Sequence, residues 1–336
     1  MPRVLRLFLV SLLVSACSQS ADKESPDAGP QGNDALGELR VPLDLQGPVD
    51  GKADMDEPAA ETVADLAPQG PQPPAPPPYA GTCPTFTAGT NKILAGTRQR
   101  SFELFLPPHP YDNGAGLVFV WHGNGDTGKS LAGYFLAQEA ANEYNAIVVA
   151  PSNCCNDNFN DCCDFSMTWN MGTFSDKEAD LAVFDGILAC IDEQFNIDNR
   201  RVYTTGFSAG SLWSSFLVVN RGQYLAAATI FSGGTGLVVD YATPGNKMPV
   251  LLAWGGTADV YMGVVDFQVM TLDFSEKLRA DGHFVAQCNH GLGHTVPFGG
   301  PTWGHRWLFA HQWGDEGSPF DGGLSADFPD YCLIPE

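Results

Sequence analysis

Residues 201–210 read RVYTTGFSAG and decide the fold. Residues 201–205 are rich in β-branched and aromatic side chains, which indicates a buried strand, and residues 211–219 (SLWSSFLVV) predict a helix. Between them, Gly-x-Ser-x-Gly places Ser208 on a sharp strand-to-helix turn, where glycine lets the chain reverse. Because the chain holds 37 glycines, this pattern can also arise by chance. The neighbouring motifs must therefore decide whether it marks a catalytic serine.

Three further motifs follow predicted strands. The apolar run 248–254 leads through glycines to Asp259, and a glycine-flanked loop carries His294. Upstream, the apolar run 117–121 leads into HGNG at residues 122–125. The order serine, aspartate, histidine is that of the catalytic residues in α/β-hydrolases and differs from the orders in chymotrypsin and subtilisin.

The three residues predict a catalytic triad with Ser208 as its nucleophile. A serine hydroxyl attacks a carbonyl poorly unless a base removes its proton, and we assign that role to His294 rather than to His290. Asp259 would orient the imidazole and stabilise its positive charge. Asp240 is a weaker candidate for the acid, and Asp266 is expected on a solvated helix face. These sites follow predicted strands or lie in glycine-rich loops.

The tetrahedral intermediate needs hydrogen-bond donors aimed at its oxyanion. We expect them to be the backbone amides of Ala209 and Asn124, with Gly123 as the alternative to Asn124. His122 is expected to pack and hydrogen bond rather than act as a base. Residues 123–130 also satisfy the phosphate-loop pattern Gly-x-x-x-x-Gly-Lys-Ser, but the acidic surface and the triad motifs disfavour nucleotide binding.

Apart from Cys17, eight cysteines predict up to four disulfides in an exported chain, with the pairing left open. They are Cys83, Cys154, Cys155, Cys162, Cys163, Cys190, Cys288 and Cys332. The pairs at 154–155 and 162–163 bracket an Asn/Asp run. A four-cysteine zinc site there would lack the Cys-x-x-Cys spacing, and a calcium loop would lack its central glycine and closing glutamate, so neither metal is expected. We expect Phe165, Trp169 and Trp254 to line the substrate pocket.

The chain divides into three parts. Residues 1–17 have a basic start, a short apolar segment and small residues before Cys17, which is typical of a lipoprotein export signal; an ordinary signal peptide is the alternative. Residues 18–80 hold 12 of the 25 prolines and 12 acids against 3 bases, which predicts a disordered acidic linker. Residues 81–336 form a single catalytic domain. The net charge of −22 disfavours nucleic acid as a partner.

From residue 81 on, predicted strands alternate with predicted helices. The strands are 99–106, 116–121, 146–150, 201–207, 225–231, 250–254 and 283–288. The helices are 129–144, 176–195, 211–219 and 265–280, with a short one after Pro301. This alternation predicts an α/β fold with a mostly parallel central sheet and helices on both faces.

Taken together, HGxG at 122–125, RVYxxGxSAG at 201–210, GGTAD at 255–259 and GxGHxxP at 291–297 resemble the secreted polyhydroxybutyrate depolymerase and feruloyl esterase family of α/β-hydrolases, with lipoprotein esterases among them. The resemblance covers about residues 81–312. It differs at Asn124, where the family often has cysteine or glycine, and in the loop of paired cysteines.

This resemblance implies a serine esterase that needs no metal or organic cofactor. Its expected substrates are feruloyl or acetyl esters of polysaccharides, or hydroxyalkanoate polyesters. The export segment with Cys17 predicts an exported monomer, held to an outer membrane or cell surface through a lipid on Cys17 or located outside the cell. Two alternatives remain open, an inactive hydrolase fold that serves as a surface binding module and a serine peptidase of the same fold.

Overall fold

The computed structural model describes residues 70–96, 98–111, 114–153, 168–171 and 177–336. Three sequence predictions concern residues outside these ranges: the signal segment with Cys17, the linker up to residue 69, and the loop of paired cysteines with Phe165.

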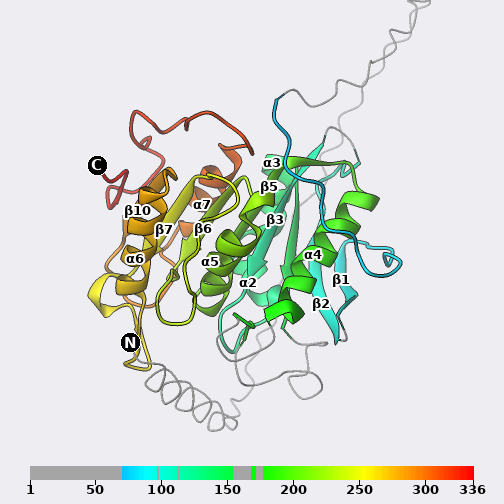
Figure 1. Ribbon diagram of the computed structural model, residues 1–336, viewed down its shortest axis with the longest axis horizontal. Helices are drawn as coiled ribbons and strands as arrows, with labels where there is room; N and C mark the ends of the chain where they lie inside the picture. The colour runs from blue at the N-terminus through cyan, green and yellow to red at the C-terminus, as the bar shows by residue number, and fades with distance from the viewer. Residues whose placement is uncertain (1–69, 97, 112–113, 154–167, 172–176) are drawn as a thin grey trace, which may run out of the picture. The chain divides into compact units, whose positions relative to one another are not determined.

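A nine-stranded sheet forms the centre of the domain, in the order β1-β2-β4-β3-β5-β6-β7-β10-β11 (Figure 1). Its strands are β1 (Gly89–Ala95), β2 (Arg98–Phe105), β3 (Ala115–Trp121), β4 (Ala146–Pro151), β5 (Ile197–Phe207), β6 (Ala227–Phe231), β7 (Val250–Trp254), β10 (Val285–Asn289) and β11 (Cys332–Leu333). The strands from β4 to β10 pair in parallel, whereas β1, β2 and β11 join antiparallel at the two edges. A separate hairpin consists of β8 (Val260–Tyr261) and β9 (Val265–Asp266).

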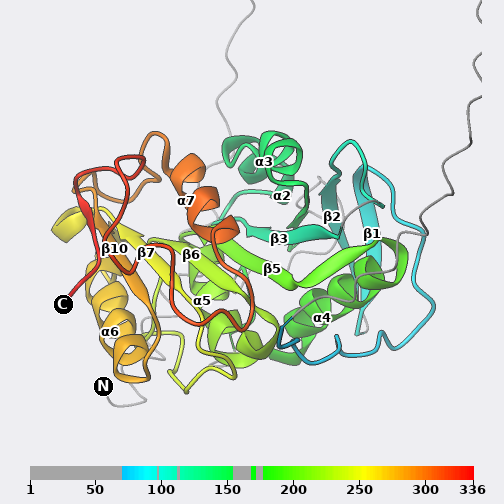
Figure 2. The ribbon, with the colours of Figure 1, turned by 90° about the horizontal axis from the view of Figure 1, so that it is seen from above.

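Helices cover both faces of the sheet. They are α2 (Gly128–Tyr134), α3 (Ala137–Tyr144), α4 (Lys177–Gln194), α5 (Ala209–Arg221), α6 (Phe267–Ala280) and α7 (Gly300–Phe309), with short 3₁₀ turns η2 (Gly222–Tyr224) and η3 (Gly256–Ala258). Figure 2 shows α2, α3 and α7 on one face and α4, α5 and α6 on the other. This arrangement confirms the predicted mostly parallel sheet between two layers of helices.

The central strand β3 shows how one apolar run supplies two cores. Leu117, Phe119 and Trp121 point into the core cluster beneath α4, α5 and α6. Val118 and Val120 point into the other cluster, beneath α2, α3 and α7. Successive side chains of a strand alternate between faces, so a strand that is buried on both sides is apolar throughout.

Two of the predicted helices differ from the sequence expectation, and strands β1, β8, β9 and β11 were not predicted. The helix expected over 129–144 is divided into α2 and α3, because Leu136 adopts a left-handed conformation with φ of 53°. The helix expected from residue 265 begins at Phe267, because residues 265–266 pair in β9. The other predicted strands and helices are present with ends shifted by a few residues.

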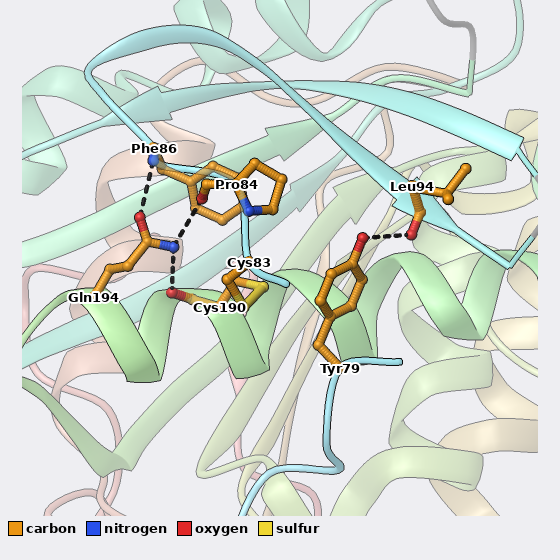
Figure 3. Close-up of a disulfide and its surroundings, with 7 residues drawn as sticks. All are labelled: Tyr79, Cys83, Pro84, Phe86, Leu94, Cys190 and Gln194. Atoms are coloured by element: carbon orange, nitrogen blue, oxygen red, sulfur yellow. Dashed lines mark hydrogen bonds between the residues drawn. A yellow bond between two sulfur atoms is a disulfide. The ribbon is translucent and has the colours of Figure 1, made fainter. Parts of the chain in front are cut away.

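A disulfide between Cys83 and Cys190 attaches the segment before β1 to α4 (Figure 3). In the same region the hydroxyl of Tyr79 donates to the carbonyl of Leu94, at 2.9 Å. The side chain of Gln194, at the end of α4, donates to the carbonyls of Pro84 and Cys190. The segment is therefore fixed to both a strand and a helix.

Contacts of the domain extend back to Gly70. A β-carbon at Gly70 would lie 3.3 Å from Nη1 of Arg200, and Pro71 lies against Gly314. Within the described part of the chain, residues 70 and 71, which composition assigned to the linker, thus contact the domain.

The second described disulfide joins Cys288 of β10 to Cys332 of β11 and holds the carboxyl-terminal segment at the sheet edge. The sequence left the pairing of the cysteines open, so neither of the two described disulfides was assigned in advance. Among the described residues, every helix is too short or too polar to span a bilayer.

Candidate active site

The predicted site residues meet at one edge of the sheet. Ser208 follows β5, Asp259 follows β7, His294 follows β10 and Asn124 follows β3. These four strands run parallel within the sheet, so their carboxyl ends lie along the same edge. This is the edge at which open α/β sheets bind ligands.

The turn that carries Ser208 is strained, with φ of 56° and ψ of −121°. A β-carbon at Gly206 would lie 2.7 Å from the carbonyl oxygen of Trp121, and one at Gly210 would overlap the same carbonyl. Only glycine permits this approach of α5 to the end of β3. The amide of Ser208 donates to the carbonyl of Phe231 at 3.1 Å, which fixes the turn against β6.

A chain of hydrogen bonds joins Ser208, His294 and Asp259. Oγ of Ser208 lies 2.9 Å from Nε2 of His294, and Nδ1 of His294 lies 2.7 Å from Oδ1 of Asp259. A carboxylate accepts a hydrogen bond from Nδ1–H, so this tautomer leaves Nε2 as the acceptor for the serine hydroxyl. The arrangement can remove a proton from the hydroxyl and retain it on the imidazole.

The second oxygen of Asp259 is also satisfied. Oδ2 accepts from the hydroxyl of Ser232 at 2.8 Å and from the amide of Gly255 at 2.9 Å. Gly255 and Gly293 lie backbone to backbone, with the amide of Gly293 donating to Gly255 at 2.9 Å, and a β-carbon at Gly255 would overlap Gly293. Gly255 and Gly293 therefore bring the loops that carry Asp259 and His294 into contact.

The imidazole of His294 lies between two phenyl rings. The ring of Phe207 stacks at 4.9 Å between centroids and the ring of Phe267 at 4.6 Å, while Tyr261 lies tilted at 5.9 Å. These rings restrict the rotation of the imidazole. The sequence assigned no role in the site to these rings or to Ser232, although Phe207 adjoins Ser208.

The residues considered as alternatives for the base and the acid lie outside the hydrogen-bonded chain of Ser208, His294 and Asp259. Nδ1 of His290 accepts from the amide of Leu292 at 3.2 Å, and burial lowers the pKa of His290 while the charge of Asp259 opposes the shift. Asp266 caps α6 by accepting from the amide of Val269 at 3.0 Å, and Asp240 is exposed. None of these three is hydrogen bonded to Ser208 or His294 in the described structure.

The residues expected to bind the oxyanion lie beside the serine. Ala209 is the first residue of α5, and the first amides of a helix have no partner within the helix. A β-carbon at Gly123 would lie 3.3 Å from the β-carbon of Ser208, which places the loop of Gly123 and Asn124 against Ser208. The side chain of Asn124 reaches away to Thr168 and Tyr261.

His122 is buried at the base of this loop. Its Nδ1 donates to the carbonyl of Gly123 at 2.8 Å, and its Nε2 accepts from the amide of Asn153 at 3.3 Å. Burial lowers the pKa of His122, so the ring is neutral and keeps one donor and one acceptor. The carbonyl of Gly123 is therefore turned toward His122.

Trp169 and Trp254 are not exposed to a substrate. Trp169 is completely buried, its indole donates to the carbonyl of His122 at 2.9 Å, and its ring contacts Trp121 and Trp213. The indole of Trp254 donates to Gln268 at 3.2 Å, and 4% of this residue is exposed. These positions correct the expectation that the two rings line a substrate pocket.

Backbone amides within the phosphate-loop pattern at residues 123–130 donate to side chains of the protein. The amide of Gly128 donates to the hydroxyl of Ser152 at 3.0 Å, and the amide of Ser130 donates to Thr127 at 3.2 Å. Amides that are already bonded cannot cradle a phosphate. In the part of the chain that the structure describes, no group of three or more His, Cys, Asp or Glu side chains could hold a metal ion.

No family model matches the chain, but two curated fungal proteins are similar to it over most of its length. Feruloyl esterase C of Emericella nidulans is 25% identical over 269 residues, which cover 74% of this chain and 86% of the relative. A probable feruloyl esterase C of Aspergillus terreus is 26% identical over 253 residues, covering 72% and 84%. The chain is a carboxylic ester hydrolase that resembles the feruloyl esterases.

Solved structures agree with the fold of this ester hydrolase. The crystal structure of native pOPH superposes with a TM-score of 0.61 at 18% identity, covering 76% of this chain and 98% of that chain. The structure of native sOPH gives the same TM-score at 19% identity, covering 75% and 95%. At these identities the likeness concerns the fold alone, and the ester hydrolase has the α/β-hydrolase fold.

Proposed function

We propose that this ester hydrolase cleaves carboxylic esters with a triad of Ser208, His294 and Asp259. The single observation that carries this proposal is the unbroken chain of hydrogen bonds, 2.9 Å from serine to imidazole and 2.7 Å from imidazole to carboxylate. The three residues come from separate loops that follow three different strands. Their order and geometry are those of the serine hydrolase triad.

The first half of the reaction transfers the acyl group to the enzyme. Oγ of Ser208 attacks the carbonyl carbon while Nε2 of His294 takes the hydroxyl proton. The negative charge moves to the carbonyl oxygen, which accepts hydrogen bonds from the amides of Ala209 and Asn124. When the carbonyl re-forms, the bond to the alcohol breaks, and His294 returns its proton to the leaving oxygen.

The second half releases the acid. A water molecule gives a proton to Nε2 of His294 and attacks the acyl carbon, and the same two amides hold the new oxyanion. Collapse of this intermediate breaks the bond to Oγ of Ser208, which recovers its proton from His294. The buried carboxylate of Asp259 stabilises the imidazolium in both halves.

The loops around His294 favour an uncharged ester. Residues 260–265 and 282–305 contain no Asp, Glu, Lys or Arg, although 17% of the chain is charged and the longer stretch would hold about four on average. Met262, Leu292 and Phe298 expose their apolar side chains on these loops. Together with the net charge of −22, this composition disfavours anionic substrates.

We therefore propose substrates that are neutral at the scissile bond, namely feruloyl or acetyl esters of polysaccharides, or hydroxyalkanoate polyesters. The names of the fungal relatives support the first class. Turnover of methyl ferulate, p-nitrophenyl acetate, solid polyhydroxybutyrate and a peptide p-nitroanilide distinguishes the possibilities. Exclusive turnover of the anilide would replace the esterase proposal with a peptidase.

Labelling with a fluorophosphonate tests the nucleophile directly. The wild-type protein is expected to be labelled at Ser208, and Ser208→Ala is expected to lose both the label and ester hydrolysis. Ser130→Ala, which removes an exposed serine hydroxyl near the site, is the matched control and should keep both. A folded wild-type protein that is neither labelled nor active would instead be a binding module.

We further propose that the enzyme is an exported monomer held by a lipid on Cys17. The two described disulfides support export, because such bonds persist in oxidising compartments. Incorporation of labelled palmitate into the expressed protein, and its loss in Cys17→Ser, tests the lipid. Light scattering after size-exclusion chromatography tests the monomer, and a dimer mass would contradict it.

A further inference from the structure

The side chain of Asn124 connects three segments of the active site. Its Oδ1 accepts from the hydroxyl of Thr168 at 2.9 Å, and its Nδ2 donates to the phenolic oxygen of Tyr261 at 3.1 Å. Both polar atoms of this exposed carboxamide are therefore hydrogen bonded to other side chains, and neither bond is part of a helix or a strand.

The segment that carries Thr168 is held by buried groups. Two residues on, the amide of Asn170 donates to Asp180 at 2.7 Å. Asp180 lies on α4 and pairs with Arg100 of β2 at 2.8 Å, and both side chains are almost completely buried. A buried pair of this kind has a fixed geometry, so the segment that carries Thr168 is anchored to the core.

Tyr261 is held by the hairpin that follows the triad acid. Its backbone pairs with Val265, and the amide of Phe267 donates to the carbonyl of Asp259 at 3.0 Å. Its ring lies 5.9 Å from the ring of His294. The phenolic oxygen therefore has a defined position relative to the acid and the base.

The peptide group that carries the amide of Asn124 is held on one side. Its carbonyl, that of Gly123, accepts from Nδ1 of His122 at 2.8 Å and from the amide of Asp126 at 3.3 Å. Gly123 and Gly125 flank Asn124, and Gly125 has φ of 75°, so Asn124 carries the only side chain within residues 123–125. An oxyanion donor must stay within a few tenths of an ångström of its productive position, and the side chain of Asn124 provides the second support of this loop.

We propose that Asn124, Thr168 and Tyr261 form a clamp that positions the amide of Asn124 for the oxyanion formed at Ser208. The side chains of the clamp are positioning residues, and the inference rests on the proposed function of the site. A clamp of this kind acts on the transition state, because the negative charge on the ester oxygen is absent from the ground state and develops there.

Each end of the clamp can be released separately. Thr168→Val removes the hydroxyl donor at similar volume, and Tyr261→Phe removes the phenolic acceptor but keeps the ring beside His294. Each is expected to lower kcat for p-nitrophenyl acetate roughly tenfold with KM within twofold. Asn124→Ala is expected to lower kcat about as far as the double variant of Thr168 and Tyr261.

Double-mutant cycles test whether the three residues act together. In the Asn124→Ala background, Thr168→Val and Tyr261→Phe are expected to have no further effect on kcat, because the bonds they remove are already absent. Affinity for phenylboronic acid, whose adduct with serine is tetrahedral, should fall in parallel with kcat. A role in stability alone would lower the melting temperature and leave kcat and this affinity unchanged.

Tyr79→Phe is the matched control. It removes a phenol that is hydrogen bonded to the carbonyl of Leu94, on the disulfide-linked segment before β1, and should leave kcat unchanged. If Asn124→Ala does not fold, the two single variants and their double variant carry the test. Wild-type kcat in both single variants, or full additivity with Asn124→Ala, would overturn the clamp.

The outcomes separate the clamp from the proposed function. If the wild-type protein hydrolyses esters and loses activity in Ser208→Ala, while Thr168→Val and Tyr261→Phe keep wild-type kcat, the clamp fails and the triad stands. If the folded wild-type protein hydrolyses no ester and resists fluorophosphonate, the proposed function fails, and the clamp fails with it.

Discussion

At the scale of single residues, the carboxylate of Asp259 has the most constrained environment in the site. It is completely buried and accepts three hydrogen bonds, from His294, Ser232 and Gly255. A buried charge is stable only when its oxygens are satisfied. The orientation of the carboxylate toward His294 therefore depends on the two groups that hold its other oxygen.

Ser232→Ala is expected to lower kcat about tenfold with little change in KM. The hydroxyl donates to Oδ2 of Asp259, and a hydrogen bond to a charged group contributes about 1.5–3 kcal/mol, of which part is expressed in the transition state. Steady-state kinetics with p-nitrophenyl acetate measures the effect. Ser325→Ala removes an exposed serine–aspartate hydrogen bond and is the matched control; equal kcat in both variants would contradict the expectation.

At this scale the sequence predicted which residues lie together, because parallel strands end at the same edge of the sheet. Ser208, Asp259 and His294 each follow such a strand, and the structure brings them within hydrogen-bond distance. The expectation for Trp169 was wrong, because the sequence does not show that the indole has a partner in the carbonyl of His122. The sequence assigned no role to Tyr261, whose contact with Asn124 spans 137 residues.

At the scale of elements, α7 buries an ionisable group without a hydrogen-bond partner for one of its nitrogens. His305 lies in the middle of α7, and burial lowers its pKa to about 4. Within the described part of the chain, Nε2 of His305 has no hydrogen-bond partner. The folded state therefore holds this imidazole in its neutral form.

This position predicts that stability falls as the medium becomes acidic. Between the unfolded pKa of 6.5 and the folded value of about 4, the unfolded chain binds more protons, so the free energy of unfolding decreases as pH falls through this range. The contribution is about 3 kcal/mol over the full interval. His305→Leu should therefore flatten the dependence of melting temperature on pH between 7 and 4.

The exposed His109 provides the matched control for this substitution. His109→Leu should keep the wild-type slope of melting temperature against pH. Calorimetry at several pH values measures the slope, which is compared instead of the absolute stability because a cavity or new contact also changes the latter. An unchanged slope in His305→Leu would show that His305 is not the group responsible.

Periodicity predicted most elements, because the apolar pattern of a strand or helix is local. It could not predict the break between α2 and α3. The left-handed residue there is Leu136, and residues 134–137 contain neither glycine nor proline to mark a turn. Strands β1 and β11 were also missed, since they pair at the sheet edges and carry weaker apolar patterns.

At the scale of the whole molecule, the two described disulfides fasten opposite edges of the sheet. Cys83–Cys190 links the segment before β1 to α4 across 107 residues, and Cys288–Cys332 links β10 to β11 across 44 residues. Neither bond is part of the triad. Their contribution is therefore expected in the stability of the domain rather than in its chemistry.

Replacing both cysteines of either disulfide by alanine should lower the melting temperature and leave kcat at 25 °C unchanged. The chain-entropy relation gives about 5 kcal/mol for the longer loop and about 4 kcal/mol for the shorter one. Thermal unfolding of the two double variants measures this. A melting temperature equal to that of the wild type in both would show that the unfolded chain gains no freedom when the bonds are absent.

The place where the chain enters the domain has a further consequence. Gly70 lies against Arg200 in the first half of β5, whereas Ser208 follows the last residue of the same strand. The first described residue of the chain and the serine thus lie toward opposite ends of the same strand. A protein held through its amino-terminal end would keep the point where the chain joins the domain away from the end of β5 that carries Ser208, so the attachment itself would leave the serine open to bulky material.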